Sequence, residues 1–230
     1  MSNDVQVANM ALSLLGADQI GSLDENSHNA RTAKLWFTQA RDSLLRAHPW
    51  KFAEQIAAIF DDWDSDKHYF EGDKVKYGST VYISLKSENH DNQPDTSAEW
   101  WDETGEKILT KHDDTYYNLP DDCIKVNSVD LHKALFRVQG NKIRVFRSFS
   151  KLYYTAKITD LEKADPLFLR TLSYALAIDM APTLAQTSQR QSQLEEHYRS
   201  FVLPEARSMD AFETTIDHVK TDTWEDARLK

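Results

Sequence analysis

The sequence predicts an α+β protein: a mainly helical host domain with a small antiparallel sheet and an inserted small all-β module. Three observations favour this fold class. Apolar residues recur at helical spacing near both ends, period-two alternation fills a stretch between them, and acidic charge gathers in one central segment. The expected domains are residues 1–60 with 107–212 for the host, 61–106 for the insertion and 213–230 for a C-terminal tail.

Two helices are expected in the first 50 residues, paired as a helical hairpin. Residues 3–15 place four apolar side chains on one face, with Asn3 as the cap and Gly16 as the terminator. A second helix begins near Ser27 and is stopped by Pro49. Its apolar stripe is Ala30, Ala33, Phe37, Ala40, Leu44 and Ala47. Small alanines along that stripe would allow another helix to approach closely.

The middle of the chain favours strands. Phe52–Phe60 is apolar without a helical period, which is typical of a strand or an extended link. Alternation at period two begins at Cys123, whose thiol is interpreted as a small buried hydrophobic group. Gly140-Asn141 joins two short alternating runs as a hairpin turn, and Leu152–Ile158 supplies a further strand.

Helices return after the strands. Asp165 and Pro166 suit the N-cap and first position of a helix. The stretch Leu167–Leu184 is apolar nearly all round, which predicts a buried helix that Pro182 kinks or breaks. A more polar helix is expected from about Ser188. Its apolar stripe is Leu194, Tyr198 and Phe201.

Charge is distributed unevenly along the 230 residues. The net charge of −10 argues against broad contact with nucleic-acid phosphates. Residues 61–106 hold 13 acids against 4 lysines, so the remainder of the chain is close to neutral. Two interpretations remain open: a solvated surface module, or a segment inserted into a near-neutral host.

Sequence patterns of catalysis and cofactor binding are missing. The six glycines form neither a dinucleotide-binding loop nor a P-loop, and the eight histidines fit no zinc pattern. Glu195-Glu196-His197 would point in different directions on a helix, and no G-x-S-x-G nucleophile elbow occurs. We therefore expect no enzyme, no catalytic residue, no metal and no cofactor.

The chain also shows no sign of membrane insertion or secretion. It has no apolar run of the roughly 18 residues that a membrane helix needs, and its N-terminus lacks a basic signal-peptide region. A single cysteine excludes an internal disulfide and fits a reducing compartment. The expectation is a soluble protein made in a cytoplasm.

Several short motifs follow one another outside the acidic segment. Leu-Leu-Gly ends the first helix, Ile-x-Ser-Leu-x-Glu follows, and the second helix closes at Arg-x-x-Pro-Trp-x-Phe-Ala. Leu-Pro-x-Asp-Cys then precedes a strand and Asp-Pro-x-Phe begins a helix. In this order the motifs resemble the tail tubular protein A family of head-to-tail adaptors from short-tailed bacteriophages.

That resemblance implies a structural protein of the virion tail or neck, made in the host cytoplasm. Such adaptors form a homo-oligomeric ring, commonly a dodecamer, that joins the portal protein to the tail nozzle protein. The ring lines a channel through which DNA passes during ejection without specific binding. The Phe168–Leu184 helix and the alanine face would then supply the protomer core and subunit contacts.

The C-terminal tail has two possible roles on this interpretation. Residues 213–230, with Phe212 before them, form a candidate strap onto the portal or a neighbouring subunit. Trp224 is its candidate anchor, because large aromatic side chains often carry interface affinity. The alternative is a disordered tail.

The acidic segment carries a second pattern: Trp, then Tyr-x-x-Gly-Asp-x-Val-x-Tyr, then Gly and Tyr, and later Pro and Trp. Its members here are Trp63, Tyr69, Gly72, Asp73, Val75, Tyr77, Gly78, Tyr82, Pro94 and Trp100. The pattern resembles the small carbohydrate-binding modules of chitinases, families five and twelve. Gly78 to Tyr82 is one residue longer than usual, which indicates a bulge or altered turn.

An alternative function follows from this second resemblance: adhesion to a host surface glycan. Trp100, Trp101 and Tyr69 are the candidate carbohydrate-binding residues, since an exposed aromatic ring can stack on a sugar. The other interpretation places these aromatic rings in the core of a module too small to have a large aliphatic one. An acid–base glycosidase is a third, less favoured possibility.

Overall fold

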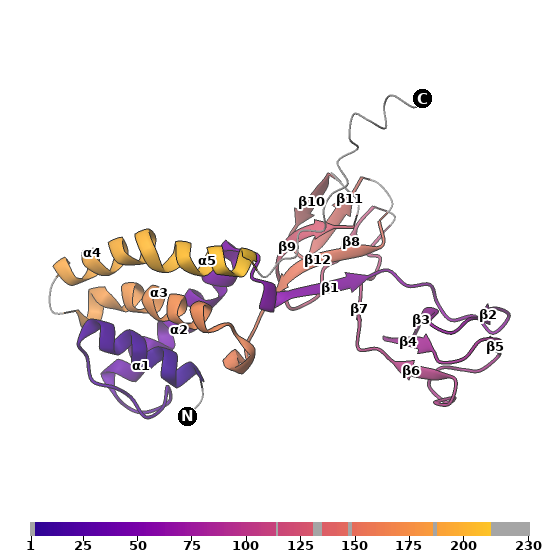
Figure 1. The fold of residues 1–230 in the computed structure, drawn as a ribbon, viewed down its shortest axis with the longest axis horizontal. Helices are drawn as coiled ribbons and strands as arrows, with labels where there is room; N and C mark the ends of the chain where they lie inside the picture. The colour runs from indigo at the N-terminus through magenta and orange to yellow at the C-terminus, as the bar shows by residue number, and fades with distance from the viewer. Residues whose placement is uncertain (1–2, 114, 131–134, 147–148, 186–187, 213–230) are drawn as a thin grey trace, which may run out of the picture. The chain divides into compact units, whose positions relative to one another are not determined.

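Helices and strands segregate into two units in the computed structural model, which describes residues 3–113, 115–130, 135–146, 149–185 and 188–212. The helical unit lies within Met1–Leu44, Trp50–Phe52 and Asp160–Lys230, and the β unit within Leu45–Pro49 and Ala53–Thr159 (Figure 1).

The fold is mixed α+β, and the expectation of a mainly helical host is wrong. Helix accounts for 41% of the chain and strand for 24%, with the strands divided among four small sheets. The prediction underestimated strand content because many strands here are two or three residues long. A strand of that length has no measurable period.

The helical unit is built from elements at both ends of the chain. These are α1 (Asn3–Leu15), α2 (His28–Ala47), η1 (Lys51–Ala53), η2 (Leu161–Lys163), α3 (Pro166–Leu184), α4 (Ser188–His197), the π-helical turn η3 (Tyr198–Val202) and α5 (Leu203–Phe212). Helix α1 packs most closely against α3, and α3 also contacts α4, η3 and α5. The expected pairing of α1 with α2 as a hairpin is therefore not the main contact of α1. Asn3 lies within α1, and its side-chain amide donates to the Leu161 carbonyl at 2.9 Å.

Helix α3 is the buried centre of this unit, as its composition predicts. Asp165 caps it, with Oδ1 accepting hydrogen bonds from the Leu167 and Phe168 amides at 2.7 and 3.1 Å. Phe168 meets Trp50 edge-on, with ring centroids 5.2 Å apart, and both are fully buried. The helix continues through Pro182 and ends two residues later.

The π-helical turn η3 changes which residues the C-terminal helices bury. The expected stripe of Leu194, Tyr198 and Phe201 assumed a constant period of 3.6 residues. A π-helical turn contains an extra residue, so Val202 takes the inward position and Phe201 is 64% exposed. The prediction for Phe201 was wrong for this reason.

The β unit contains two sheets around a shared core. The first has the order β7 (Lys107–Ile108), β1 (Glu54–Ala58), β12 (Lys151–Ala156) and β9 (Cys123–Val129). The second has the order β10 (Phe136–Gln139), β11 (Lys142–Val145) and β8 (Tyr117–Asn118). Ile143, Leu152 and Tyr154 are fully buried in this core. The first sheet is mixed rather than purely antiparallel, because β7 runs parallel to β1.

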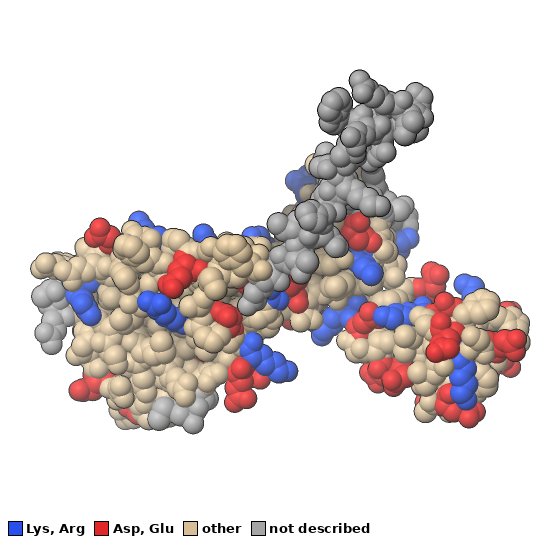
Figure 2. Space-filling view, viewed as in Figure 1, with Lys and Arg blue, Asp and Glu red and all other residues tan. Residues whose placement is uncertain are grey.

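Residues 61–106 form short strands with an aromatic core. They are β2 (His68–Tyr69), paired with β5 (Asn89–His90), and the sheet β3 (Lys74–Tyr77), β4 (Thr80–Ser84) and β6 (Trp101–Glu103). Gly78, at φ 61°, allows a tight turn in which Tyr77 pairs with Thr80. The register continues without a bulge to the pair of Val75 with Tyr82. Acidic side chains are scattered over the segment's visible surface among lysines and uncharged residues (Figure 2).

Candidate functional site

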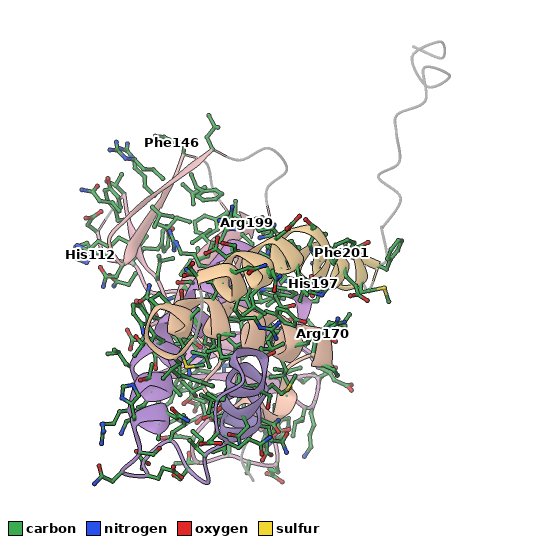
Figure 3. All side chains as sticks on the ribbon, turned by 90° about the vertical axis from the view of Figure 1, so that its left-hand side faces the viewer. His112, Phe146, Arg170, His197, Arg199 and Phe201 are labelled. Carbon is green, nitrogen blue, oxygen red and sulfur yellow. The ribbon has the colours of Figure 1, made fainter. Side chains whose placement is uncertain are left out.

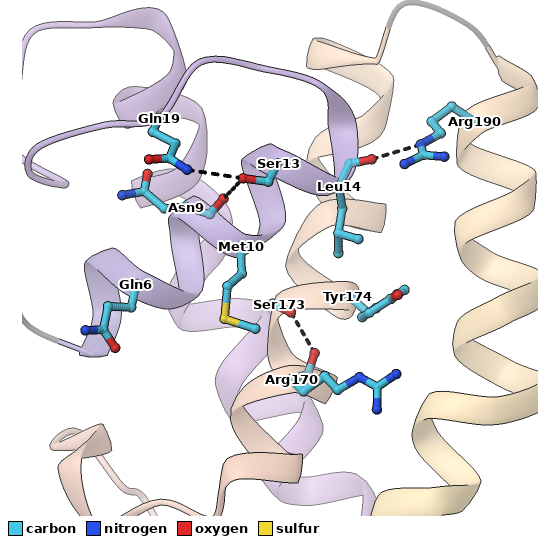
Figure 4. A pocket seen from close by; sticks show the side chains of 10 residues that line it. All are labelled: Gln6, Asn9, Met10, Ser13, Leu14, Gln19, Arg170, Ser173, Tyr174 and Arg190. Carbon is cyan, nitrogen blue, oxygen red and sulfur yellow. Dashed lines mark hydrogen bonds between the residues drawn. The ribbon is translucent and has the colours of Figure 1, made fainter.

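A shallow, open groove lies on the helical unit. Helices α1, α3 and α4 and the loop after α1 enclose about 590 Å³ (Figure 4). Met10, Leu14 and Tyr174 supply apolar surface, while Arg170 and Arg190 bring positive charge. No carboxylate lines it. The groove therefore combines an apolar lining with two cations.

Hydrogen bonds hold the walls of this groove in place. Arg190 Nε donates to the Leu14 carbonyl at 2.8 Å, which joins α4 to the end of α1. Asn9 exchanges two hydrogen bonds with the backbone of Ile20, at 2.8 and 2.9 Å, and thereby fixes the loop after α1. Arg170 Nη1 lies 3.3 Å from Glu205 Oε2 on α5. Groove and loop are thus formed before any partner binds.

A row of three rings continues from the groove across the helical surface. Tyr174 of α3 (Figure 4) lies 5.5 Å from His197 of α4, measured between ring centroids. His197 in turn lies 5.4 Å from Phe201 (Figure 3). We call these three residues the aromatic row. His197 and Phe201 are exposed, while Tyr174 also lines the groove. The π-helical turn is what brings Phe201 to the surface.

Other large apolar side chains of the helical unit are also exposed. They include Met10 in the groove, Leu35 on α2, and Met209 and Phe212 on α5. Phe212, the candidate docking residue, ends α5 and is 79% exposed. Trp224, its partner in that prediction, lies outside the described residues. Singly exposed apolar side chains are common on protein surfaces, so these residues do not by themselves mark a contact surface.

The three candidate sugar-binding residues occupy two kinds of environment. Tyr69 and Trp101 belong to the buried aromatic core of residues 61–106, where their rings meet edge to face at 5.2 Å. The indole of Trp101 donates to the Asn92 carbonyl at 2.7 Å. Trp100 is only partly buried, but Lys86 Nζ lies 4.7 Å from its ring centroid. The structure does not bring the three rings together as a flat exposed platform.

The part of the chain that the structure describes contains no evident catalytic centre. No group of three or more His, Cys, Asp or Glu side chains there could hold a metal ion. Burial raises the pKa of the Cys123 thiol to about 11, with a contribution from the Asp122 carboxylate. Burial also raises the pKa of Tyr154, whose hydroxyl donates to Asp122 at 3.0 Å. Both groups stay protonated at neutral pH and contribute to the core.

Most of the groove could not be found from the sequence. Met10 and Arg170 are 160 residues apart, and no local pattern connects them. Tyr174 was assigned to a helix expected to be buried all round, and Arg190 to an ordinary polar helix face. The spacing of Tyr174, His197 and Phe201 also gives no signal, because the π-helical turn that aligns the last two is not visible in apolar periodicity.

Comparison with known proteins adds no information about function, so the function is argued from the geometry described above. No protein-family model matches the chain, and no curated protein matches its sequence. Within the described residues, no helix is long and apolar enough to cross a membrane.

Proposed function

We propose that this chain is a structural protein of a bacteriophage virion, a head-to-tail adaptor that assembles into a ring between the portal and the tail nozzle. The observation that supports it best is the continuous surface of groove and aromatic row on the helical unit. In the proposed ring, this surface packs against a second copy of the chain or against the portal. The partners named here, the portal and the tail nozzle, come from the resemblance of the motifs, in their order along the chain, to the tail tubular protein A family.

The composition of this surface fits a protein partner. Interface cores are enriched in Tyr, Phe, Met and Arg, and binding energy gathers in a few such side chains. Tyr174, Phe201, Met10 and Arg170 provide all four types on one side of the unit. Hydrogen bonds hold the walls of the groove in place, so little conformational entropy is lost when a partner binds.

Assembly with and without the portal protein tests this proposal. The full chain is examined by native mass spectrometry and electron microscopy, alone and with the portal protein of the same particle. We expect a ring of about twelve copies in the presence of the portal. Phe201→Asp should reduce the assembled fraction at least tenfold, because it places a charge in the contact.

Phe70→Asp is the matched control. Phe70 is 65% exposed, against 64% for Phe201, but it belongs to residues 61–106. This variant should assemble like the wild type. A chain that stays monomeric with the portal, or equal losses in both variants, would contradict the proposed surface.

Glycan adhesion has less support from the geometry. Two of the three candidate rings are buried, and the third has a lysine ammonium over its face. No observation on residues 61–106 favours sugar binding over a structural role for these rings.

A further inference from the structure

The β10–β11 hairpin carries a concentration of positive charge that the adaptor interface does not use. The hairpin itself carries three cations, Arg137, Lys142 and Arg144, and residues 131–159 around it contain seven Lys and Arg in all and no Asp or Glu, although the whole chain has a net charge of −10. This contrast is as sharp as the acidic excess of residues 61–106. Charge segregation of this kind on one hairpin is the electrostatic footprint of an anionic partner.

The strand register separates the two faces of this hairpin. Phe136 pairs with Val145, and Val138 pairs with Ile143, which is fully buried in the core of the β unit. Side chains alternate along a strand, so the intervening positions project from the opposite face. That face, which we call the basic hairpin face, consists of Arg137 and Gln139 on β10, Lys142 and Arg144 on β11, and Phe146 just beyond β11.

Arg137 and Arg144 stand directly opposite each other across the two strands. Like charges in this position oppose strand pairing. Neither guanidinium has a carboxylate within 4.0 Å among the residues that the structure describes. Arg144 instead lies over the Phe146 ring, 4.9 Å from its centroid, and Phe146 is 57% exposed (Figure 3). The fold thus maintains two neighbouring cations without neutralising them.

Lys142 extends the same face toward the end of the hairpin. Its Nζ lies 2.6 Å from His112 Nε2, and the Asp113 carboxylate is close enough to interact with it. Backbone hydrogen bonds from Thr115 and Tyr116 lower the pKa of Asp113, so this acid stays charged at neutral pH. It partly offsets Lys142, which leaves Arg137 and Arg144 as the main cations.

We propose that the basic hairpin face binds the sugar-phosphate backbone of double-stranded DNA. Guanidinium groups form paired hydrogen bonds with phosphate oxygens, and two guanidiniums on adjacent strands can clamp neighbouring phosphates. Alternate side chains on a strand, such as Lys142 and Arg144, repeat at about 6.8 Å, which is comparable to the distance between successive phosphates on one DNA strand. A two-stranded ribbon is also narrow enough to lie in the major groove.

DNA is favoured over an acidic protein surface for two reasons. The cations are mostly arginines in a regular two-strand register, which suits a repeating row of phosphates. The choice of DNA as the ligand also rests on the proposed function, because a head-to-tail adaptor surrounds a channel through which DNA passes. The acidic remainder of the chain should keep the contact weak and non-specific, so that DNA is guided and not held.

Fluorescence anisotropy with a labelled 24-base-pair duplex tests the inference on the full chain. At low salt we expect a Kd of roughly 10 µM, within the range of non-specific binding. Arg137→Gln with Arg144→Gln should weaken binding at least tenfold. It should also reduce the slope of log affinity against log salt concentration by about two, one for each lost phosphate contact. Circular dichroism checks that the double variant is folded.

The matched control removes the same charge from the helical unit. Arg31 and Arg199 are both exposed, and Arg31→Gln with Arg199→Gln should change duplex affinity less than twofold. Equal losses in the two double variants would show a net-charge effect only and would overturn the proposal. So would an absence of duplex binding.

Polyglutamate serves as the competing probe. Arginine-dependent binding of polyglutamate without duplex binding would assign the face to an acidic protein partner and overturn the DNA assignment. Failure of this inference can be distinguished from failure of the proposed function. Normal ring assembly without duplex binding contradicts this inference alone, whereas arginine-dependent duplex binding by a chain that forms no ring contradicts the adaptor alone.

Discussion

Cys123 illustrates how burial decides the chemistry of a single residue. Its raised pKa leaves very little thiolate at pH 8, and the thiolate is the reactive form. Alkylation by iodoacetamide should therefore be about a hundredfold slower in the folded chain than in the unfolded one, where the pKa is 9.0. Mass spectrometry of timed samples, with and without 6 M guanidinium chloride, measures both rates. Comparable rates would mean that the thiol is accessible.

Asp179 on α3 is a residue whose charge opposes folding. Burial raises its pKa, and Tyr198 is close enough for the two groups to interact. For a carboxyl group with a raised folded-state pKa, the cost to stability is present at neutral pH, where it is ionised. That cost disappears as the pH falls below its unfolded value of about 3.8.

Asp179→Asn should accordingly have a higher Tm than the wild type at pH 7. The difference should shrink as the pH is lowered and vanish near pH 3, where the carboxyl group is protonated in both states. Thermal melts followed by circular dichroism at several pH values measure it. Asp61→Asn, at an exposed position on residues 61–106, is the control and should leave Tm unchanged. A Tm difference that is constant with pH would point to packing and not to ionisation.

At the scale of elements, the two neighbouring tryptophans before and in β6 should behave differently. Trp101 is 2% exposed and central to a small aromatic core, so Trp101→Ala should destabilise residues 61–106 by about 3–5 kcal/mol. Trp100 is partly exposed, and Trp100→Ala should cost less than about half as much. Denaturant titration followed by Trp fluorescence measures both changes. Equal losses would show that Trp100 is also a core residue.

The same pair tests the glycan alternative. With Lys86 over the Trp100 ring, we expect the wild-type chain to wash off chitin beads without retention. Retention that is lost in Trp100→Ala, in a variant that stays folded, would favour sugar binding instead.

Elements with long, regular patterns were predictable from the sequence, and irregular ones were not. The Asp165 cap, the buried α3 and the Gly140 hairpin turn follow from local rules, and the structure confirms each of them. The π-helical turn η3 breaks the period that apolar spacing assumes, so the exposure of Phe201 could not be foreseen. The groove depends on contacts between α1 and α3, which only tertiary packing determines.

At the scale of the whole molecule, the chain contains two units, each with its own core. Phe168, fully buried, is central to the helical unit, and Leu152, equally buried, is central to the β unit. Because Phe168 packs on Trp50 and Phe52 in the helical unit and Leu152 belongs to the core of the β unit, a cavity at one should destabilise its own unit and spare the other. Unfolding of the full chain should therefore depart from a single two-state transition.

Differential scanning calorimetry of Phe168→Ala and Leu152→Ala tests this independence. Each substitution should cost about 2–5 kcal/mol and lower the Tm of its own unit by several degrees, leaving the other transition in place. Near-UV circular dichroism assigns the transitions, because Trp50 belongs to the helical unit, while Tyr117 and Tyr154 belong to the core around Leu152. If both variants shifted one common transition, the two units would fold as a single cooperative body, and a surface variant such as Phe201→Asp could then act through the β unit as well.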